Sequence, residues 1–475
     1  MKLVQTHGSR NCRSSSGTTQ DFHDATVSPV VPRPAKPAMS RLPTPLLLRS
    51  LILTSLMSSK LFLRPALYVL NKVANSRSAI LDPDRNYMLN KLLRWTVYDH
   101  FCAGTSREEV AKTIAHVKSI GFQGVILGYS KEIVVDPDTE VTKSDAKSPI
   151  HSGRDVRAIQ EWKGRTLETL RMVGSGDFLA VKYVVPGSKQ STGSQMLIIE
   201  AFDRLTGAGP IAVDLMKGRQ PMPKLVADAV DEICQEARHQ GSRLWLDAEQ
   251  QALQHGLDDW AIEIMRKQNW SSTPLVYNTI QAYLKGSSAN LDRHLTFAAR
   301  EGWSLGIKLV RGAYIEHETR SLIHNCKTDT DRSYDLLANR MLCRIMSTNN
   351  EGLKFPEAAL FLATHNAASA FKAIATHKAR LASGQPTVLL ECGQIQGMAD
   401  ELGCELVQSY ESVLMNVGGG RVPNPKTFKC MAWGSVSECL QYLHRRAIEN
   451  KGAVERTEHM VKALRRELRR RVIGF

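Results

Sequence analysis

The sequence lacks the residue patterns that mark several common classes of protein. Its nine cysteines include no CxxC pair, which argues against a zinc ribbon or a disulfide scaffold and favours a reducing compartment. No GxGxxG follows an apolar run and no GxxxxGKS or GxxxxGKT occurs, so the sequence predicts neither a dinucleotide-binding turn nor a P-loop. HExxH, GxSxG and paired histidine ligands are also missing. We therefore predict no metal site and no serine hydrolase.

Acidic residues are scarce at both ends of the chain. The formal net charge is +15, but the first 80 residues contain eleven Lys or Arg against two Asp, and the last 25 contain eight against three Glu. The 370 residues between these ends are therefore almost neutral. A nucleic-acid-binding domain should be basic on its folded surface. We expect no nucleic-acid partner.

The first 45 residues contain no Glu and are rich in Ser, Thr, Pro and Arg. This composition is typical of a mitochondrial transit leader, and plain disorder is the alternative. Residues 45–70 are apolar, but their longest uncharged run, 50–59, is about half of the roughly 20 residues that a membrane span needs. We predict no transmembrane helix, but an interfacial or core-packing helix in a helical arm over residues 46–120.

Short apolar runs recur through the rest of the chain. A capping box formed by Ser106 and Glu109 predicts a helix that ends near Gly121, just before the first run. The eight runs are residues 124–128, 178–184, 243–247, 275–281, 306–310, 359–364, 388–392 and 428–433. Most are continuously apolar, as expected of strands that are buried on both faces.

Helical patterns lie between many of these runs, as at residues 223–239, 253–268 and 367–377. Strands that alternate with helices form a parallel sheet, and eight of them in one domain favour a closed α/β barrel of the (βα)8 TIM type over an open sheet. We predict that residues 121–475 form this barrel.

Polar side chains end several of the apolar runs. They are Lys182; Asp247 and Glu249; Gln281; Lys308, Arg311 and Tyr314; and Thr364, His365 and Asn366. The active site of such a barrel is built at the C-terminal ends of its strands. Any one of these groups could be a satisfied buried polar residue, but their repetition along one rim favours a binding site.

A second polar constellation lies on one predicted helix near the C-terminus. Tyr442, Arg445, Arg446 and Glu449 are spaced at i, i+3, i+4 and i+7 and share one face of that helix. An arginine pair is often a solvated surface. Beside the mouth of a barrel, however, two guanidinium groups are suited to clamp the carboxylate of a substrate.

Six segments of the sequence are similar to the consecutive motifs of one known family. They are DAE at 247–249, NTIQAY at 278–283, KLVRGAY at 308–314, ATHN at 363–366, GQIQGM at 393–398 and RRAIEN at 445–450. Together they resemble the proline dehydrogenase (proline oxidase) family, and its fungal mitochondrial branch most of all. The resemblance covers about residues 75–460.

The resemblance implies a distorted (βα)8 barrel that binds FAD non-covalently and oxidises L-proline to 1-pyrroline-5-carboxylate. Electrons would then pass to ubiquinone. It also implies a mitochondrial enzyme on the matrix side of the inner membrane, in peripheral contact with the bilayer.

The matching motif positions also imply a role for each site residue. Lys182, Asp247 and Tyr314 would be catalytic pocket residues. Arg445 and Arg446 would bind the substrate carboxylate, with Tyr442 and Ile395 completing the pocket. The flavin would be held by Gln281, Lys308, Arg311, Gly312, Ala313, Thr364, His365, Asn366 and Glu449, with Lys308 on the flavin ring and Arg311 on the pyrophosphate.

The sequence departs from the family at one position in the pocket. Where the family has a tyrosine fifteen residues before the first arginine of the pair, this chain has Cys430. Relatives that act on 4-hydroxyproline also have a small residue here, so hydroxyproline is an alternative substrate.

Two other functions are open from the sequence. Cys430 and the unusual glycine-rich stretch 417–425 would suit a catalytically impaired paralogue that acts as a binding protein. The retained arginine pair and flavin motifs count against it. A flavin-free barrel enzyme that acts on sugar phosphates is the other alternative, and it lacks a glycine-rich phosphate loop.

Overall fold

The computed structural model describes residues 36–58, 60–74, 76, 78–130, 153–181, 216–315, 318–347, 352–414, 425–451 and 454–474. The chain divides into two compact units, Met1–Lys36 and Pro37–Phe475, and the second is described here. Most of the predicted leader, residues 1–45, lies outside the described residues, as do Lys182 and nearly all of the glycine-rich stretch 417–425.

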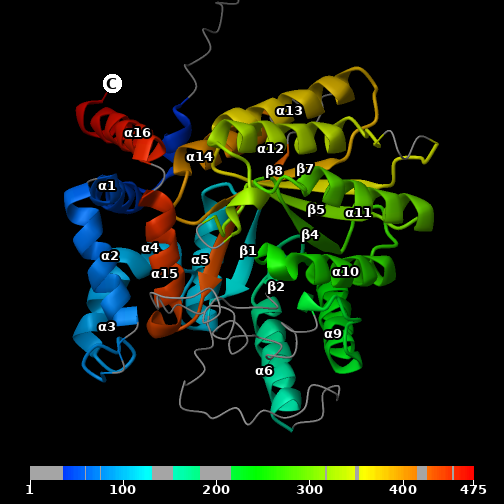
Figure 1. The fold of residues 1–475 in the computed structure, drawn as a ribbon. Coiled ribbons are helices and arrows are strands. Elements are labelled where there is room, and N and C mark those ends of the chain that lie inside the picture. The colour runs from blue at the N-terminus through cyan, green and yellow to red at the C-terminus, as the bar shows by residue number, and fades with distance from the viewer. Residues whose placement is uncertain are drawn as a thin grey trace, which may run out of the picture. The chain divides into compact units, whose positions relative to one another are not determined.

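Eight parallel strands close into a barrel in chain order, so the predicted fold is confirmed (Figure 1). The strands are β1 (Gly124–Tyr129), β2 (Phe178–Val181), β3 (Arg243–Leu246), β4 (Val276–Gln281), β5 (Leu305–Val310), β6 (Ala358–Ala363), β7 (Leu389–Ile395) and β8 (Lys426–Trp433). Each coincides with a predicted run to within a few residues. Continuous apolar runs are the signal here because both faces of each strand are buried.

Helices surround the strands. They are α5 (Arg107–Ser119), α6 (Gly153–Leu170), α9 (Lys224–Gln240), α10 (Gln251–Gln268), α11 (Ser287–Glu301), α12 (Lys327–Leu342), α13 (Ala367–Ala382), α14 (Asp400–Leu414), α15 (Val436–Lys451) and α16 (Val454–Ile473), with a short 3-10 turn η3 (Arg320–Leu322). The capping box is present, since the Glu109 amide donates to Ser106 Oγ at 3.3 Å. The Glu109 carboxylate accepts from the amide of Thr105, one residue before the cap.

The interior of the barrel is filled by aromatic rings. Phe178, Trp245 and Phe361 are fully buried there, and the ring centroids of Trp245 and Phe361 lie 4.6 Å apart in an edge-to-face arrangement. Gly393 on β7 makes room for one of them, because a Cβ at this position would lie 2.7 Å from the Phe361 ring. The barrel is therefore a packed core rather than a pore.

A buried ion pair closes the N-terminal end of the barrel. Arg243 donates to both carboxylate oxygens of Glu391, at 2.6 and 2.9 Å, and its guanidinium carbon lies 4.0 Å from the Phe178 ring centroid. A depression of about 960 Å³ adjoins this pair at the same end. Above the aromatic layer, the polar rim that the sequence predicts lies at the opposite, C-terminal end.

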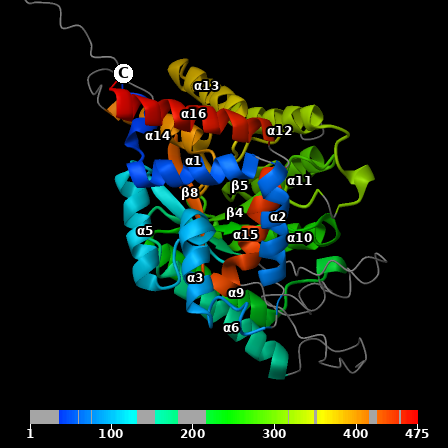
Figure 2. The same ribbon diagram turned by 90° about the vertical axis from the view of Figure 1, so that its left-hand side faces the viewer.

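The N-terminal residues of this unit form helices, as predicted. They are η1 (Ala38–Arg41), α1 (Thr44–Ser58), α2 (Lys60–Ala74), α3 (Tyr87–Leu93), the π-helical turn η2 (Arg94–Tyr98) and α4 (Asp99–Phe101). Helix α1 packs against α16 and α2 packs against α15 (Figure 2). The predicted boundary at residue 120 between arm and barrel stays a prediction.

The apolar segment 45–70 falls within two of these helices, α1 and α2, rather than one. The inner face of α1 carries the buried residues Leu47, Ser50 and Leu53. Among the described residues, no helix combines the length and the hydropathy needed to cross a membrane.

Candidate functional site

The strand ends bring most of the predicted site residues to one rim of the barrel. Lys308 on β5 and Asp247 after β3 form its central contact, with Lys308 Nζ 2.6 Å from Asp247 Oδ1. The same Nζ lies 4.4 Å from the centroid of the Trp245 ring, which faces the barrel interior directly below. The ammonium group is thus held between a carboxylate and an aromatic face, both of which stabilise its positive charge.

A second set of contacts joins the ends of β3 and β4 to the loop after β5. The Tyr314 hydroxyl donates to Ala248 O at 3.0 Å and to Glu249 Oε2 at 3.2 Å. Gln281 Nε2 donates to Glu249 O at 2.9 Å. Gln281 Oε1 is buried and has no hydrogen-bond partner within the described ranges. A buried acceptor of this kind is costly unless a ligand donor meets it.

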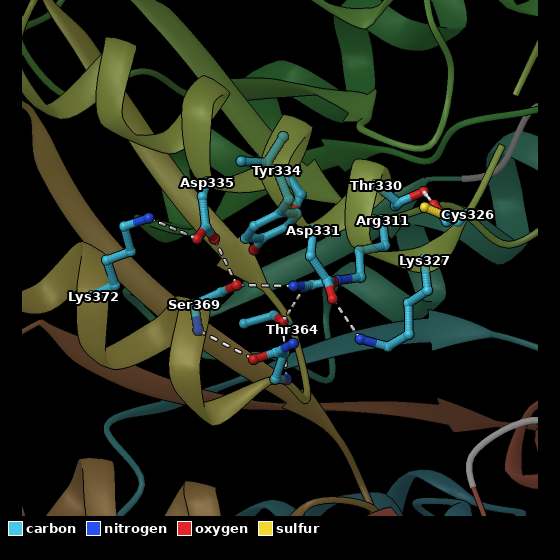
Figure 3. A network of polar contacts seen from close by, with 12 residues as sticks. Arg311, Cys326, Lys327, Thr330, Asp331, Tyr334, Asp335, Thr364, Ser369 and Lys372 are labelled. Carbon is cyan, nitrogen blue, oxygen red and sulfur yellow. Dashed lines mark hydrogen bonds and ion pairs between the residues drawn. The ribbon is translucent and has the colours of Figure 1, made fainter. Parts of the chain in front are cut away.

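Arg311 forms the centre of a polar network behind the rim (Figure 3). Its Nε donates to Asp331 at 2.7 Å, and its two terminal nitrogens donate to Thr364 Oγ1 at 2.9 Å and Ser369 Oγ at 2.8 Å. Its guanidinium carbon lies 4.3 Å from the centroid of the Tyr334 ring. Three directed hydrogen bonds and a stacked ring fix the guanidinium plane.

The network carries more positive than negative charge. Lys327 also donates a hydrogen bond to Asp331, and Lys372 donates one to Asp335. Asp335 in turn accepts a hydrogen bond from the Ser369 hydroxyl. Burial raises the pKa of Asp331, but hydrogen bonds and charges from Lys327 and Arg311 outweigh it and hold that pKa below its usual value. With Arg311, the network sets three cations against two carboxylates. One positive charge is left for an anionic ligand.

The residues that follow β6 are held in place by neighbouring elements. Asn366 caps α13, because its Oδ1 accepts from the Ser369 amide at 3.1 Å. The Ile395 amide at the end of β7 donates to His365 Nε2 at 3.1 Å. That nitrogen must therefore be an acceptor, which in a neutral imidazole places the proton on Nδ1.

Cys430 faces the interior of the barrel on β8, as the substrate-pocket prediction requires. It packs against the interior aromatic cluster, and its register partners are Ile126 on β1 and Ile395 on β7. Tyr442 on α15 is buried in a neighbouring apolar cluster, against which Ile395 also packs. These contacts place Ile395 beside Cys430 and against the apolar cluster that contains Tyr442.

The remaining predicted residues are placed only in part. Lys182 would follow the last residue of β2, Val181, but lies outside the described residues. Arg445, Arg446 and Glu449 lie on helix α15, which packs against α2 and β8. Their side chains are outside what the structure describes. Gly312 and Ala313 lie in the exposed loop after β5.

Sequence reasoning missed the partners of the predicted residues. Asp331 and Ser369 hold Arg311, and Trp245 lies under Lys308. The position of Ser369, three residues after the helix cap Asn366, is a local signal that could have pointed to it. Asp331 has no such signal.

The comparisons with known proteins agree with this geometry. The sequence model described as "Proline dehydrogenase" matches residues 110–459, about three quarters of the chain. The chain belongs to the proline dehydrogenase family. The family match begins inside α5 and ends in α16, so it contains every strand of the barrel and every predicted site residue.

Curated relatives carry two kinds of name. "Probable proline dehydrogenase, mitochondrial" of Schizosaccharomyces pombe is 26% identical over 417 residues, which cover 82% of each chain. "Proline dehydrogenase 1, mitochondrial" of Arabidopsis thaliana is 28% identical over 415 residues, which cover 82% of this chain and 76% of that one. "Hydroxyproline dehydrogenase" of Rattus norvegicus is 27% identical over 405 residues, which cover 81% and 83%.

Among solved structures, proline utilization A of Bdellovibrio bacteriovorus, inactivated by N-propargylglycine, superposes with a TM-score of 0.58 at 15% identity. The match covers 84% of this chain and 38% of that longer one. At this identity the likeness concerns the fold alone, and it agrees with the closed barrel.

The residues at the rim fit the flavin that the proline dehydrogenase family implies. The unpartnered Gln281 Oε1 is an acceptor without a donor among the described residues. Gly312 has a φ of +135°, and a Cβ there would lie 2.0 Å from the Tyr283 ring. A side chain is thus excluded from the loop beside Arg311, whose network retains one positive charge for a diphosphate. Within the described ranges, no group of His, Cys, Asp and Glu could hold a metal.

Proposed function

We propose that this protein is an FAD-dependent dehydrogenase that oxidises L-proline to 1-pyrroline-5-carboxylate. The observation that carries the proposal is the contact between Lys308 and Asp247 at the C-terminal rim of a barrel that the family match spans. This contact joins Lys308, which we expect to bind the flavin, to Asp247, which we expect in the substrate pocket. The reaction removes a hydride from the ring carbon and a proton from the ring nitrogen.

On the flavin side, the residues of this chain bind and orient. Bound FAD would supply the acceptor for the hydride. Arg311 would hold the diphosphate, since its planar fork is already fixed by Asp331, Thr364 and Ser369. Gln281 Oε1 and Lys308 Nζ would accept from and donate to the ring system. Because Lys308 is a cation, it would favour negative charge on the reduced ring.

On the substrate side, the residues of this chain would bind the charged carboxylate and exclude water. Arg445 and Arg446 would clamp the carboxylate from α15, because a guanidinium offers a bidentate fork to it. Ile395 and the buried Tyr442 would form an apolar wall, which keeps water away from the reacting carbon. The carbon next to nitrogen would then be held against the flavin, so the catalytic gain comes mainly from orientation.

4-Hydroxyproline is the second candidate substrate. Cys430 faces the barrel interior, where the family has a tyrosine, and relatives named hydroxyproline dehydrogenase match over about four fifths of this chain. A cysteine leaves more space beside the substrate ring than a tyrosine would. A non-catalytic binding protein is disfavoured, because the charged contacts of the rim are retained.

The visible spectrum of the purified full-length chain tests this proposal. We expect bound flavin, giving yellow protein that bleaches when proline or 4-hydroxyproline is added without oxygen. Colourless protein that takes up no FAD on reconstitution would refute the flavin-dependent function. Flavin that is retained but bleached by neither amino acid would refute both substrates and favour the binding protein.

We also propose that the electrons pass to ubiquinone and that the protein acts on the matrix side of the mitochondrial inner membrane. Several curated relatives are named as mitochondrial, which supports the compartment. A quinone acceptor is lipid-soluble, so the enzyme has to meet the bilayer surface. We further propose that residues 1–45 are the transit leader, 46–120 the arm and 121–475 the FAD-binding barrel. The described end of this leader is folded, because Met39 and Leu42 are buried in the second unit.

The arm offers a surface suited to an anionic bilayer. The face of α3 and η2 exposes Tyr87, Met88, Lys91, Leu92 and Trp95, the last with 67% of its surface accessible. The outer face of α1 adds a stripe of Leu48, Ile52 and Leu56. Figure 2 shows α1, α2 and α3 on one side of this unit.

Charge on the arm complements this apolar surface. Residues 46–120 contain eleven Lys or Arg and five Asp or Glu. Exposed aromatic and aliphatic side chains beside basic ones are typical of peripheral membrane contacts, because the rings enter the interface while the cations face anionic headgroups. We therefore propose peripheral contact through this surface.

A further inference from the structure

The turn that joins β7 to α14, residues 395–400, has an unusual backbone. Gly397 has a φ of +74°, and Ala399, which is not a glycine, has a φ of +51°. Left-handed conformations of non-glycine residues persist where surrounding contacts hold them. We therefore expect contacts from neighbouring elements to hold this turn in its conformation.

The outer side of the turn is held by buried polar groups from three elements. His100 Nε2 of α4 lies 3.1 Å from Gly397 O. Lys429 Nζ of β8 lies 2.8 Å from Asp400 Oδ1 and 3.3 Å from Met398 O. Ser50 Oγ of α1 lies 3.3 Å from Asp400 Oδ2. His100, Ser50, Lys429 and Asp400 are each at most 5% exposed.

His100 also fits the shape of the turn closely. A Cβ at position 397 would lie 2.6 Å from His100 Cδ2 and 2.7 Å from its Nε2. Burial lowers the pKa of the His100 imidazole, an effect that the nearby Asp400 carboxylate opposes without reversing. The ring is therefore neutral near pH 7, and Nε2 carries the proton that it donates to Gly397 O.

The inner side of the same turn touches the candidate pocket. The Ile395 amide donates to His365 Nε2 at 3.1 Å, and the Gln396 amide donates to Cys430 O at 2.8 Å. Ile395 itself packs against the apolar cluster that contains Tyr442. A displacement of the turn would therefore move the wall beside Cys430 and loosen His365.

We propose that His100 is a positioning residue, through which the helical arm sets the Ile395 wall and thereby the discrimination between proline and 4-hydroxyproline. This inference rests on the proposed function for its substrates, but its geometric basis is independent of it. The arm then completes the substrate pocket, although it lies outside the barrel and is far from the site motifs in sequence.

The first test compares His100→Phe, which keeps a ring but loses the donor, with His100→Gln, which keeps a donor. Losing one buried hydrogen bond changes an equilibrium by about three- to ten-fold. We expect His100→Phe to raise KM for proline and to shift the ratio of kcat/KM for the two substrates by about that factor. Flavin content should not change, and His100→Gln should restore most of the ratio. His116→Phe, on the exposed face of α5, is the matched control.

Hydrogen exchange of the peptide that contains residues 393–400 provides a readout that needs no activity. His100→Phe should speed exchange of the Ile395 and Gln396 amides in the flavin-loaded protein. Faster exchange with an unchanged substrate ratio would overturn the proposal, because the role would be structural only. Unchanged exchange would overturn it as well. If wild type oxidises neither substrate, the proposed function fails, while the exchange result still decides whether His100 holds the turn.

A double-mutant cycle covers the case in which His100→Phe does not fold. Gly397→Ala places a methyl group against the His100 ring, so its cost in stability should be smaller in a His100→Ala background than in wild type. The backbone strain of alanine at a φ of +74° is common to both backgrounds and cancels. Equal costs in the two backgrounds would contradict the contact.

Discussion

Lys308 and Asp247 bond to each other at the rim of the barrel, with 2.6 Å between Nζ and Oδ1, although 61 positions separate them in the sequence. The pair bridges β5 to the end of β3, across β4. The side chains are 11% and 22% exposed, so solvent screens the pair only partly. We therefore expect a substitution of either residue to change both flavin binding and substrate binding.

Lys308→Met should destabilise the protein and weaken flavin binding. It removes the ammonium group that donates to the largely buried Asp247 carboxylate, which costs about 1 to 3 kcal/mol. Asp247→Asn should cost less in the Lys308→Met background than in wild type, because the carboxylate charge that Lys308 stabilises is then absent. Urea unfolding and flavin titration measure these effects. Lys224→Met, whose ion pair is exposed, should change stability by less than about 0.5 kcal/mol. Additive costs for Lys308→Met and Asp247→Asn would contradict the coupling.

Arg445→Met should weaken substrate binding and leave the flavin in place. Removing one partner of a charge-assisted carboxylate contact costs about 2 to 5 kcal/mol, or roughly thirty-fold or more in affinity. Steady-state kinetics with proline would show this as a higher KM, while the flavin spectrum reports retention. Arg469→Met, on the exposed face of α16, controls for the loss of charge. An unchanged KM would mean that Arg445 lies on a solvated face.

Cys430→Tyr should shift selectivity toward proline. A tyrosine at this inward-facing position of β8 would fill space beside the substrate ring, and such a wall is worth about 1 to 3 kcal/mol of discrimination against an added hydroxyl. The ratio of kcat/KM for proline and trans-4-hydroxyproline measures it. Cys343→Tyr, at the partly exposed end of α12, is the control. The same ratio in wild type and Cys430→Tyr would show that Cys430 does not contact the substrate.

Alkaline carbonate should release the protein from mitochondrial membranes, because the proposed contact is peripheral. Trp95→Ser should also lower partitioning onto anionic vesicles by about ten-fold, since one buried aromatic side chain contributes about 1 to 2 kcal/mol. Trp270→Ser is a matched control, because Trp270 is 64% exposed, against 67% for Trp95, and borders the depression at the N-terminal end of the barrel instead of lying on the arm. Retention in the carbonate pellet, or equal losses for the two variants, would refute the proposed surface.

The barrel and the kinds of residue at its rim can be predicted from the amino-acid sequence alone. Continuous apolar runs are a local signal, and strands buried on both faces must produce them, so all eight strands could be located. Parallel strands also place their C-terminal ends together. Lys308, Arg311 and Thr364 could therefore be assigned to one rim from their positions after the runs alone.

The pairing of these groups depends on the three-dimensional packing and could not be predicted from the sequence. Whether Lys308 meets Asp247, whether Asp331 and Ser369 hold Arg311, and whether His100 reaches Gly397 depend on the side-chain packing between separate elements. Such contacts leave no periodicity in a sequence, because the partners are distant in the chain and each residue alone is compatible with many environments. The arm is a clear example. Its sequence predicts helices, but not that His100 of α4 contacts the turn between β7 and α14.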